Sequence, residues 1–329
     1  MTVNCPGCLK VAEIAFCKKC LQVLFDGQKV SPILPFNSPY KENSEIFLEH
    51  TKKISISGVQ VKYSLRLAGN DLQLTDARGQ YILKPIPLGT FKFVDQAPAN
   101  EHLTMQIAKQ LYKINVPANA LMTFKDGSPA YIVRRFDQTA RQKIQQEDFA
   151  QIAQMTSETH GKNYKYDLSY EEIAELIQKY IPTYKIALEK YFQLILFNYL
   201  FSNGDAHLKN FSAMQSAQGD YVLTPAYDLL CTRIHSPTES GLALDLMKED
   251  FSDAYQSYGF YTYQDFFEFG QKIGIKDSRV KKILASFIIP KKAVHQLTEQ
   301  SYLSVECKNL YVNYYEDRLK RMNMNLVDL

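Results

Sequence analysis

The sequence predicts an α+β fold of two lobes, in which a strand-rich lobe precedes an all-helical lobe. A chain of 329 residues exceeds the roughly 250 to 300 residues at which one hydrophobic core stops growing. Strand patterns dominate from about residue 52 to 135, and helical spacing of apolar residues dominates from about 147 onward. Four cysteines gather in the first twenty residues, which adds a small segment before the first lobe.

The strand-rich region begins with a hairpin, because two strand patterns flank the turn dipeptide Gly69-Asn70. A helix interrupts the strands at Asn100–Leu111, where apolar residues recur on one face. The order is therefore strand, strand, strand, helix, strand. The predicted strands are Lys62–Ala68, Asp71–Thr75, Gln80–Lys84 and Tyr131–Phe136.

The second lobe has apolar residues at helical spacing over most of its length. The segment Lys185–Phe201 is the strongest of these patterns and predicts a buried helix. The predicted helices are Glu171–Lys179, Lys185–Phe201, Tyr263–Ile273, Arg279–Phe287 and Ala293–Arg321.

The N-terminal cysteines are written C-P-G-C-x8-C-K-K-C. Two Cys-x-x-Cys pairs are typical of thiolate ligands to a tetrahedral Zn²⁺, so we predict a structural zinc. The alternatives are reduced thiols in a disordered segment and cysteines that oxidise on purification. A redox role is disfavoured, because no thioredoxin-like strand and helix surround the pairs. The four residues are Cys5, Cys8, Cys17 and Cys20.

Composition narrows the class of protein. With 46% apolar and 22% charged residues, the chain has an ordinary globular composition. Its apolar runs are too short to cross a bilayer, and its start lacks the pattern of a secretory signal, so we expect a cytoplasmic protein without a membrane contact. The net charge of +3 with dispersed Lys and Arg gives no indication of direct nucleic-acid binding.

Two short segments carry the chemistry, S-N-G-D-A-H-L-K-N from Ser202 and A-Y-D-L ending beyond Asp228. Asp205 and Asn210 have the Asp-x4-Asn spacing of a kinase catalytic loop, in which the Asp accepts a hydroxyl proton and the Asn binds Mg²⁺. Asp228 follows at the place of a second Mg²⁺ carboxylate. We therefore predict phosphoryl transfer from ATP with Mg²⁺. His207 is predicted to act in the site, with a buried structural imidazole as the alternative.

The first lobe supplies matching elements. Lys84 ends the apolar strand Y-I-L-K, the form of the strand whose lysine pairs with nucleotide phosphates. Glu101, early in the following helix, is expected to pair with Lys84 in the nucleotide site. The segment Ile54–Lys62 can present backbone N–H groups to phosphates, although its one glycine, Gly58, also fits an ordinary surface turn.

Seven segments in order resemble the HipA-like serine/threonine kinase toxins, over roughly residues 50 to 320. The closer likeness is to the short HipT form, because the extra N-terminal subdomain of full-length HipA is missing and S-I-S-G matches the HipT loop. The resemblance implies a two-lobed protein-kinase-like fold and serine/threonine kinase activity. The segments are S-I-S-G-V-Q-V-K, Y-I-L-K-P, N-E-H-L-T-M, Y-I-V-R-R-F-D, Q-E-D, N-G-D-A-H-L-K-N-F and A-Y-D-L.

The resemblance also implies site residues and a division of the chain. Ser55 and Ser57 would be autophosphorylated in a loop that moves on phosphorylation. The expected divisions are a four-cysteine segment 1–24, a linker 25–51, an N-lobe 52–140 and a helical C-lobe 141–329. The expected ATP contacts are Ser57, Gly58, Val59, Gln60, Val61, Lys62, Lys84, Arg134, Arg135, Phe136, His207, Lys209, Asn210, Tyr227 and Asp228.

Members of this family phosphorylate aminoacyl-tRNA synthetases and are restrained by HipS-like and HipB-like antitoxin proteins, so such partners are expected. The cysteine-rich start departs from the HipT form and resembles the start of other HipA-domain proteins. Two alternatives remain open. One is a small-molecule or lipid kinase, and the other is a zinc-containing pseudokinase or binding module. Intact Lys84, Asp205, Asn210 and Asp228 disfavour the pseudokinase.

Overall fold

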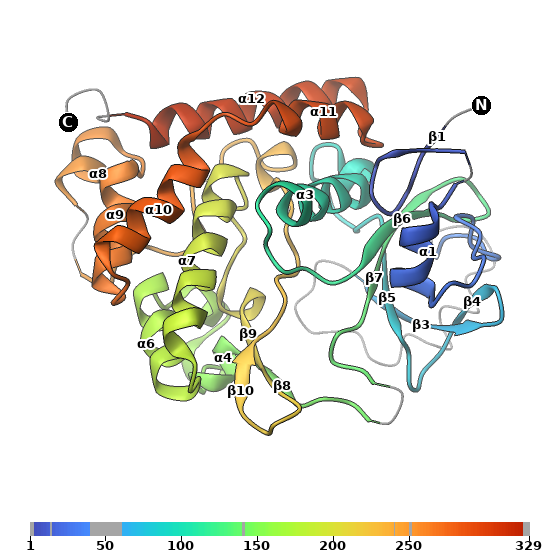
Figure 1. Cartoon of the computed structure of the whole chain (residues 1–329), viewed down its shortest axis with the longest axis horizontal. Helices are drawn as coiled ribbons and strands as arrows, with labels where there is room; N and C mark the ends of the chain where they lie inside the picture. Colours follow the sequence, from blue (N-terminus) through green and yellow to red (C-terminus); the bar gives the residue numbers. More distant parts are fainter. Residues whose placement is uncertain are drawn as a thin grey trace.

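The structure is a computed structural model of the chain. It describes residues 3–13, 15–39, 61–139, 142–239, 241–249 and 252–324. The predicted nucleotide loop and autophosphorylation sites at Ser55 and Ser57–Gln60 lie outside the described residues. A strand-rich lobe occupies the right side of Figure 1 and a helical lobe the left, so the predicted α+β class with two lobes is confirmed.

The first lobe is built on a five-stranded antiparallel sheet with strand order β4-β3-β5-β7-β6. The predicted hairpin turns at Gly69, whose φ of 62° lies in the left-handed region that glycine adopts at little cost. Strand β6 was not predicted. The strands are β3 Tyr63–Ala68, β4 Asp71–Leu74, β5 Tyr81–Pro85, β6 Asn119–Thr123 and β7 Pro129–Arg134.

Helix α3 (Ala97–Leu111) covers one face of this sheet. It packs on β6 and β7, and it shares a core with Leu121 and Tyr131 of those strands. Twelve of its fifteen residues are buried, because the second lobe covers its other sides. Pro98 stands in its first turn, where a missing N–H costs nothing. The core around α3 continues into the helical lobe, so both lobes hold this helix in place.

The N-terminal segment covers the opposite face of the sheet. It forms strands β1 (Val3–Asn4) and β2 (Val11–Ala12), then helix α1 (Lys18–Phe25). Helix α1 buries Leu21, Leu24 and Phe25 against a second core that includes Tyr81 and Leu83 of β5. The four-cysteine segment is thus part of the first lobe's packing.

The described part of the predicted linker extends the same sheet. Leu34 N–H donates to Thr123 O at 2.8 Å, and Thr123 N–H donates to Pro32 O at 2.9 Å. These bonds form a parallel bridge between Ile33 and Thr123 at the edge of β6. The linker therefore wraps onto the body as expected, while the division at residues 24, 51 and 140 stays a prediction.

The other helices of the second lobe pack around helix α7 (Tyr184–Leu200; Figure 1), which is mostly apolar and buried over most of its length. A small sheet of order β10-β9-β8 makes the lobe less than all-helical, which corrects that part of the prediction. Its strands are too short to show a pattern of their own. They are β8 Gln146–Asp148, β9 Ser212–Gln215 and β10 Tyr221–Leu223.

The long helix predicted over Ala293–Arg321 is two helices, α11 and α12, which corrects that prediction. The hydroxyl of Ser304 accepts the N–H of Cys307 at 3.3 Å and caps the start of the second helix. The apolar residues that suggested a single helix therefore belong to two helices. Within the described residues, no helix is both long and apolar enough to cross a membrane. The helices are α4 Phe149–Ile152, α5 Ser157–His160, α6 Tyr170–Tyr180, α7 Tyr184–Leu200, α8 Asp253–Tyr258, α9 Tyr263–Lys272, α10 Asp277–Ile288, α11 Lys292–Gln300 and α12 Val305–Met322.

Candidate active site

A cavity of about 810 Å³ lies where the two lobes meet. Lys84 and Phe136 line it from the first lobe, and Asp205, Asn210 and Asp228 line it from the second. Its volume falls in the range of pockets that enclose a cofactor-sized molecule. The residues predicted for phosphoryl transfer are therefore brought together around one cavity.

Lys84 forms the centre of a buried charge cluster. Strand β5 carries it to the α3 side of the sheet, where its Nζ donates to Glu101 Oε1 at 2.6 Å and to Asp228 Oδ1. Burial alone would lower the pKa of Lys84, but the carboxylates of Asp228 and Glu101 outweigh it and raise that pKa, so the ammonium stays charged at neutral pH. The predicted pair of Lys84 and Glu101 is thus present.

Asp228 follows β10 in a left-handed backbone conformation with φ of 55°, which is uncommon outside glycine and turns its carboxylate toward the cavity. Lys62 Nζ lies 3.6 Å from its Oδ2. Burial would raise the pKa of Asp228, but the ammonium groups of Lys62 and Lys84 hold it well below its ordinary value. The carboxylate is therefore ionised and available as a hard oxygen ligand.

Asn210 is the neighbour of Asp228 across the cavity floor. Its Nδ2 lies 3.5 Å from Asp228 Oδ2, and its Oδ1 accepts the N–H of His207 at 3.1 Å. Because an amide oxygen has two lone pairs, Oδ1 can keep this bond and still bind a cation. A carboxylate and an amide oxygen form the ligand set that Mg²⁺ prefers.

Two buried asparagines, which were not among the predicted site residues, hold the segment around Asp228. Asn203 Nδ2 donates to Asp228 O at 3.3 Å. Asn100 of α3 forms a two-way bond with Cys231, since its Nδ2 donates to Cys231 O at 2.9 Å and its Oδ1 accepts Cys231 N–H at 3.0 Å. The helix that carries Glu101 is thereby tied to the loop that carries Asp228.

Asp205 lies at the mouth of the cavity with 55% of its side chain exposed. Tyr166 donates its hydroxyl to Asp205 Oδ1 at 2.6 Å, and His207 Nε2 lies 3.8 Å from the same oxygen. The Tyr166 ring packs edge-on against the His207 ring, with 5.3 Å between ring centres. Tyr166 was not among the predicted site residues, because its contact with Asp205 joins distant parts of the sequence.

His207 is buried beside Asp205. Burial lowers its pKa to about 4 although the Asp205 carboxylate opposes the shift, so the imidazole is neutral at neutral pH. Its Nδ1 is buried without a hydrogen-bond partner in the part of the chain that the structure describes. The structure thus places His207 beside the proposed base as a neutral group.

Glu239 packs against the loop that carries Asp205. It was not among the predicted site residues. A Cβ at Gly204 would lie 1.8 Å from Glu239 Oε1, so any larger residue here would force the Glu239 side chain to move. Thr232 joins the two residues, because its hydroxyl accepts Gly204 N–H at 2.9 Å and lies 2.7 Å from Glu239 Oε1. Burial raises the pKa of Glu239 to about 7, against the Thr232 hydrogen bond.

The connection between the lobes borders the cavity with one aromatic pair. The Phe136 ring stacks on Tyr227 with 6.0 Å between centres, and Tyr227 donates to Lys209 O at 3.0 Å. Ile82 and Val133 line the same cavity with apolar side chains, which suits a flat nucleobase.

The two arginines of this connection use their guanidinium groups within the fold. Arg134 pairs with Asp26 just after α1, at 2.8 and 3.0 Å, although it also borders the cavity. Arg135 pairs with Asp137 at 2.9 and 2.5 Å. Val61 and Lys62, the described end of the predicted nucleotide loop, lead directly into β3, and Lys62 lines the cavity.

The fold and the cavity define a protein of the kinase-like class. Residues 54–294 match the family model described as HipA-like C-terminal domain, and the chain belongs to this family. A relative from Haemophilus influenzae, named "Putative kinase", is 30% identical over 321 residues, which cover 92% of this chain and 91% of that protein. The predicted family is therefore confirmed, while the closer likeness to the HipT form stays a prediction.

More distant relatives point the same way. The serine/threonine-protein kinase toxin HipA of Shewanella oneidensis is 25% identical over 227 residues, covering 64% of this chain and 50% of that protein, so the match spans about half its length. The solved complex of Shewanella oneidensis HipA with HipB and operator DNA gives a TM-score of 0.61 at 20% identity, covering 89% of this chain and 74% of that one. Helicobacter pylori proinflammatory kinase CtkA gives 0.51 at 14% identity, covering 78% and 90%. These two structures support the fold.

Proposed function

We propose that the chain is a serine/threonine protein kinase that uses ATP and Mg²⁺. The observation that carries this proposal is the arrangement of Lys84, Asn210, Asp228 and Asp205 around one cavity. A buried ammonium and two oxygen ligands lie on its inner side, and an exposed carboxylate lies at its mouth. Phosphoryl transfer depends mainly on positioning and charge stabilisation, which such a set supplies.

Each residue has a distinct role in this proposal. Lys84, held by Glu101, contacts the nucleotide phosphates, while Asp228 and Asn210 bind Mg²⁺. Asp205 accepts the proton of the acceptor hydroxyl, and neutral His207 restricts the position of that carboxylate. The predicted zinc has no part in phosphoryl transfer. Autophosphorylation at Ser55 or Ser57 also belongs to the proposal and rests on the family resemblance.

The exposure of Asp205 favours a macromolecular acceptor over a small molecule. A carboxylate with 55% of its side chain in solvent can meet a serine or threonine presented by another protein. We infer a toxin that acts on a component of translation, such as an aminoacyl-tRNA synthetase, in the cytoplasm. HipS-like and HipB-like antitoxins are its proposed partners, supported by the HipB in the Shewanella oneidensis complex. No direct contact with nucleic acid or membrane is proposed.

The test is to incubate purified protein with radiolabelled ATP and Mg²⁺, alone and with a cell lysate, and to identify labelled products by mass spectrometry. Label on serine or threonine of a lysate protein supports the proposal. Label only on a small molecule indicates the small-molecule kinase instead. Absence of transfer with intact ATP binding indicates the pseudokinase.

A further inference from the structure

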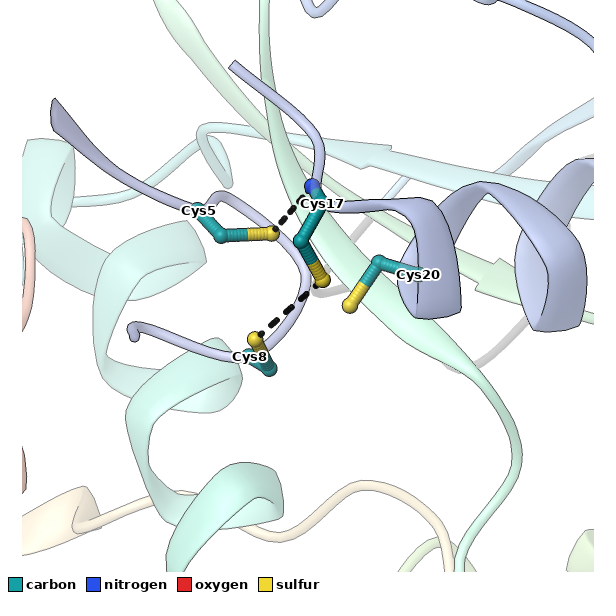
Figure 2. Close-up of side chains that lie close together, drawn as sticks. All are labelled: Cys5, Cys8, Cys17 and Cys20. Carbon is teal, nitrogen blue, oxygen red and sulfur yellow. Dashed lines mark hydrogen bonds between the residues drawn. The ribbon is translucent and has the colours of Figure 1, made fainter. Parts of the chain in front are cut away.

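The four N-terminal cysteines converge on one point. Their sulfur atoms lie within 4.8 Å of one another, and Cys8 Sγ is 3.9 Å from Cys17 Sγ. Four thiolates at about 2.3 Å from a tetrahedral Zn²⁺ would be about 3.8 Å apart. All six cysteines of the chain are free thiols, so no disulfide explains the approach. Figure 2 shows two sulfurs coming from the loop before β2 and two from the start of α1.

The backbone around the cluster has the form of a metal-binding turn. Leu9 N–H donates to Cys5 O at 2.8 Å, and Leu9 itself has a φ of 64°, which closes a tight loop around the first pair. The N–H of Cys17 points at Cys5 Sγ at 3.3 Å. A Cβ at Gly7 would lie 2.8 Å from both Cβ and Sγ of Cys20, so the loop needs glycine to bring the pairs together.

We propose that Cys5, Cys8, Cys17 and Cys20 bind one Zn²⁺ and that this metal holds the segment which supports helix α3. Four thiolates fill a tetrahedral shell and leave no open position, which makes the site structural and not catalytic. Thiolates also favour this thiophilic cation over Mg²⁺, so the two metals use separate sites.

The loop between Cys5 and Cys8 packs directly on α3 and the sheet. Gln110 Nε2 of α3 donates to Cys8 O at 2.9 Å, and Leu121 N–H of β6 donates to Pro6 O at 3.0 Å. The backbone of Gly7 lies beside His102, the residue after Glu101. The loop between Cys5 and Cys8 therefore contacts α3 one residue away from Glu101, the partner of Lys84.

The same segment also reaches the second lobe and the lobe connection. Asn4 Nδ2 donates to Gln300 O at 2.8 Å at the end of α11, and Tyr302 donates to Asn4 O. After α1, Asp26 holds Arg134 of β7. Because the metal would hold the segment that makes these contacts, we expect its removal to weaken them together. We expect α3 to lose its fixed position, and the consequence for ATP rests on the proposed function.

Metal content tests the site. Full-length protein purified in reductant should contain about one zinc per chain by elemental analysis, and Cys8→Ser should lose most of it. Cys307→Ser is the matched control, because Cys307 is a buried thiol on α12 outside the cluster. Less than about half an equivalent in wild type, or equal loss in the control, overturns the proposal. If Cys8→Ser does not fold, Co²⁺ exchange into wild type decides: a tetrahedral thiolate spectrum supports the site, and an octahedral one contradicts it.

Thermal melting and calorimetry test the link to α3. Protein stripped of zinc by a chelator and then returned to chelator-free buffer with Mg²⁺ should have a lower Tm and an ATP affinity weaker by about threefold or more, and added Zn²⁺ should restore both. Bound zinc whose removal changes neither quantity contradicts the supporting role while leaving the metal site in place. Zinc content and Tm do not depend on phosphoryl transfer, so failure of the kinase proposal would be seen separately.

Discussion

Tyr166 donates its hydroxyl to Asp205 Oδ1 at 2.6 Å, and both residues line the cavity. Burial, followed by the hydrogen bond to Asp205, raises the pKa of Tyr166, which keeps the phenol protonated as a donor. An acceptor hydroxyl must donate to the same carboxylate before transfer. Tyr166 and the acceptor therefore compete for the proposed base.

Tyr166→Phe should raise the rate of phosphoryl transfer, because it removes the competing donor and keeps the ring that packs on His207. A hydrogen bond to a charged group is worth about 1.5 to 3 kcal/mol, and about 1.4 kcal/mol corresponds to a tenfold change in rate, so an increase of about tenfold or more is expected. Radiolabel transfer at saturating ATP measures it. Tyr164→Phe, from the same short helix but outside the cavity, is the control. An unchanged or lower rate would show that Tyr166 positions Asp205 and does not block it.

Asp228→Asn should weaken Mg²⁺-dependent ATP binding about tenfold or more, because the change removes a charged metal ligand and the partner of Lys62 and Lys84. Asp205→Asn serves as the comparison and should leave ATP affinity within about threefold, since the proposed base binds no phosphate. Calorimetry with and without Mg²⁺ separates the two effects. Equal losses in both variants would contradict this division of roles.

Glu239 should make the free energy of unfolding depend on pH. Burial raises its pKa from the ordinary 4.5 to about 7. Between these values the folded protein holds a proton that the unfolded chain has released, so this contribution to stability falls as the pH rises from about 4.5 to about 7. Glu239→Gln removes the ionisation, and its Tm relative to wild type should rise across that window.

The matched control for this pH series is Glu175→Gln, an exposed glutamate of α6. Its Tm difference from wild type should stay constant over the same pH range. Parallel melting curves for Glu239→Gln and wild type would mean that Glu239 is ionised throughout.

Ser55 and Ser57 are predicted to limit activity once one of them is phosphorylated. A phosphoserine carries about −1.5 to −2 charge at pH 7 and would repel ATP phosphates from the same loop. We expect Ser55 to be the main site. Phosphosite mapping of wild type and Asp205→Asn, with ATP affinity for each form, provides the measurement. Unmodified serines in an active enzyme, or equal ATP affinity in both forms, would remove this regulation.

The local parts of the site could be predicted from the sequence. The spacing of Asp205 and Asn210 lies within one loop, and Lys84 ends a strand that its own apolar pattern indicates. Their partners Tyr166 and Glu239 could not be predicted, because these contacts join separate segments and follow from packing. Asn203 lies two residues before Asp205 in the same motif, so the sequence could have indicated it as a site residue.

The fold shows the same limit. Helix α3 has an apolar period of its own, whereas β6 is five residues without alternation, and its pairing with β7 makes it a strand. Ser304 caps the start of α12 and so indicates the break between α11 and α12. Apolar residues continue at helical spacing across this break, so the sequence pattern alone predicts one helix. The cysteine segment packs on the sheet through contacts with residues far away in the sequence. No local sequence pattern indicates this position.

Asp205 is the proposed base of an ATP-dependent phosphoryl transfer, and one rate comparison tests this role most directly. Wild type and Asp205→Asn, matched in Tm and in ATP affinity, are given radiolabelled ATP with Mg²⁺, and transfer to protein is followed over time. A general base contributes about a hundredfold to ten-thousandfold, so the variant should be slower by at least about a hundredfold. Equal transfer rates in the two proteins, or binding of ATP by wild type without any transfer, would contradict the account.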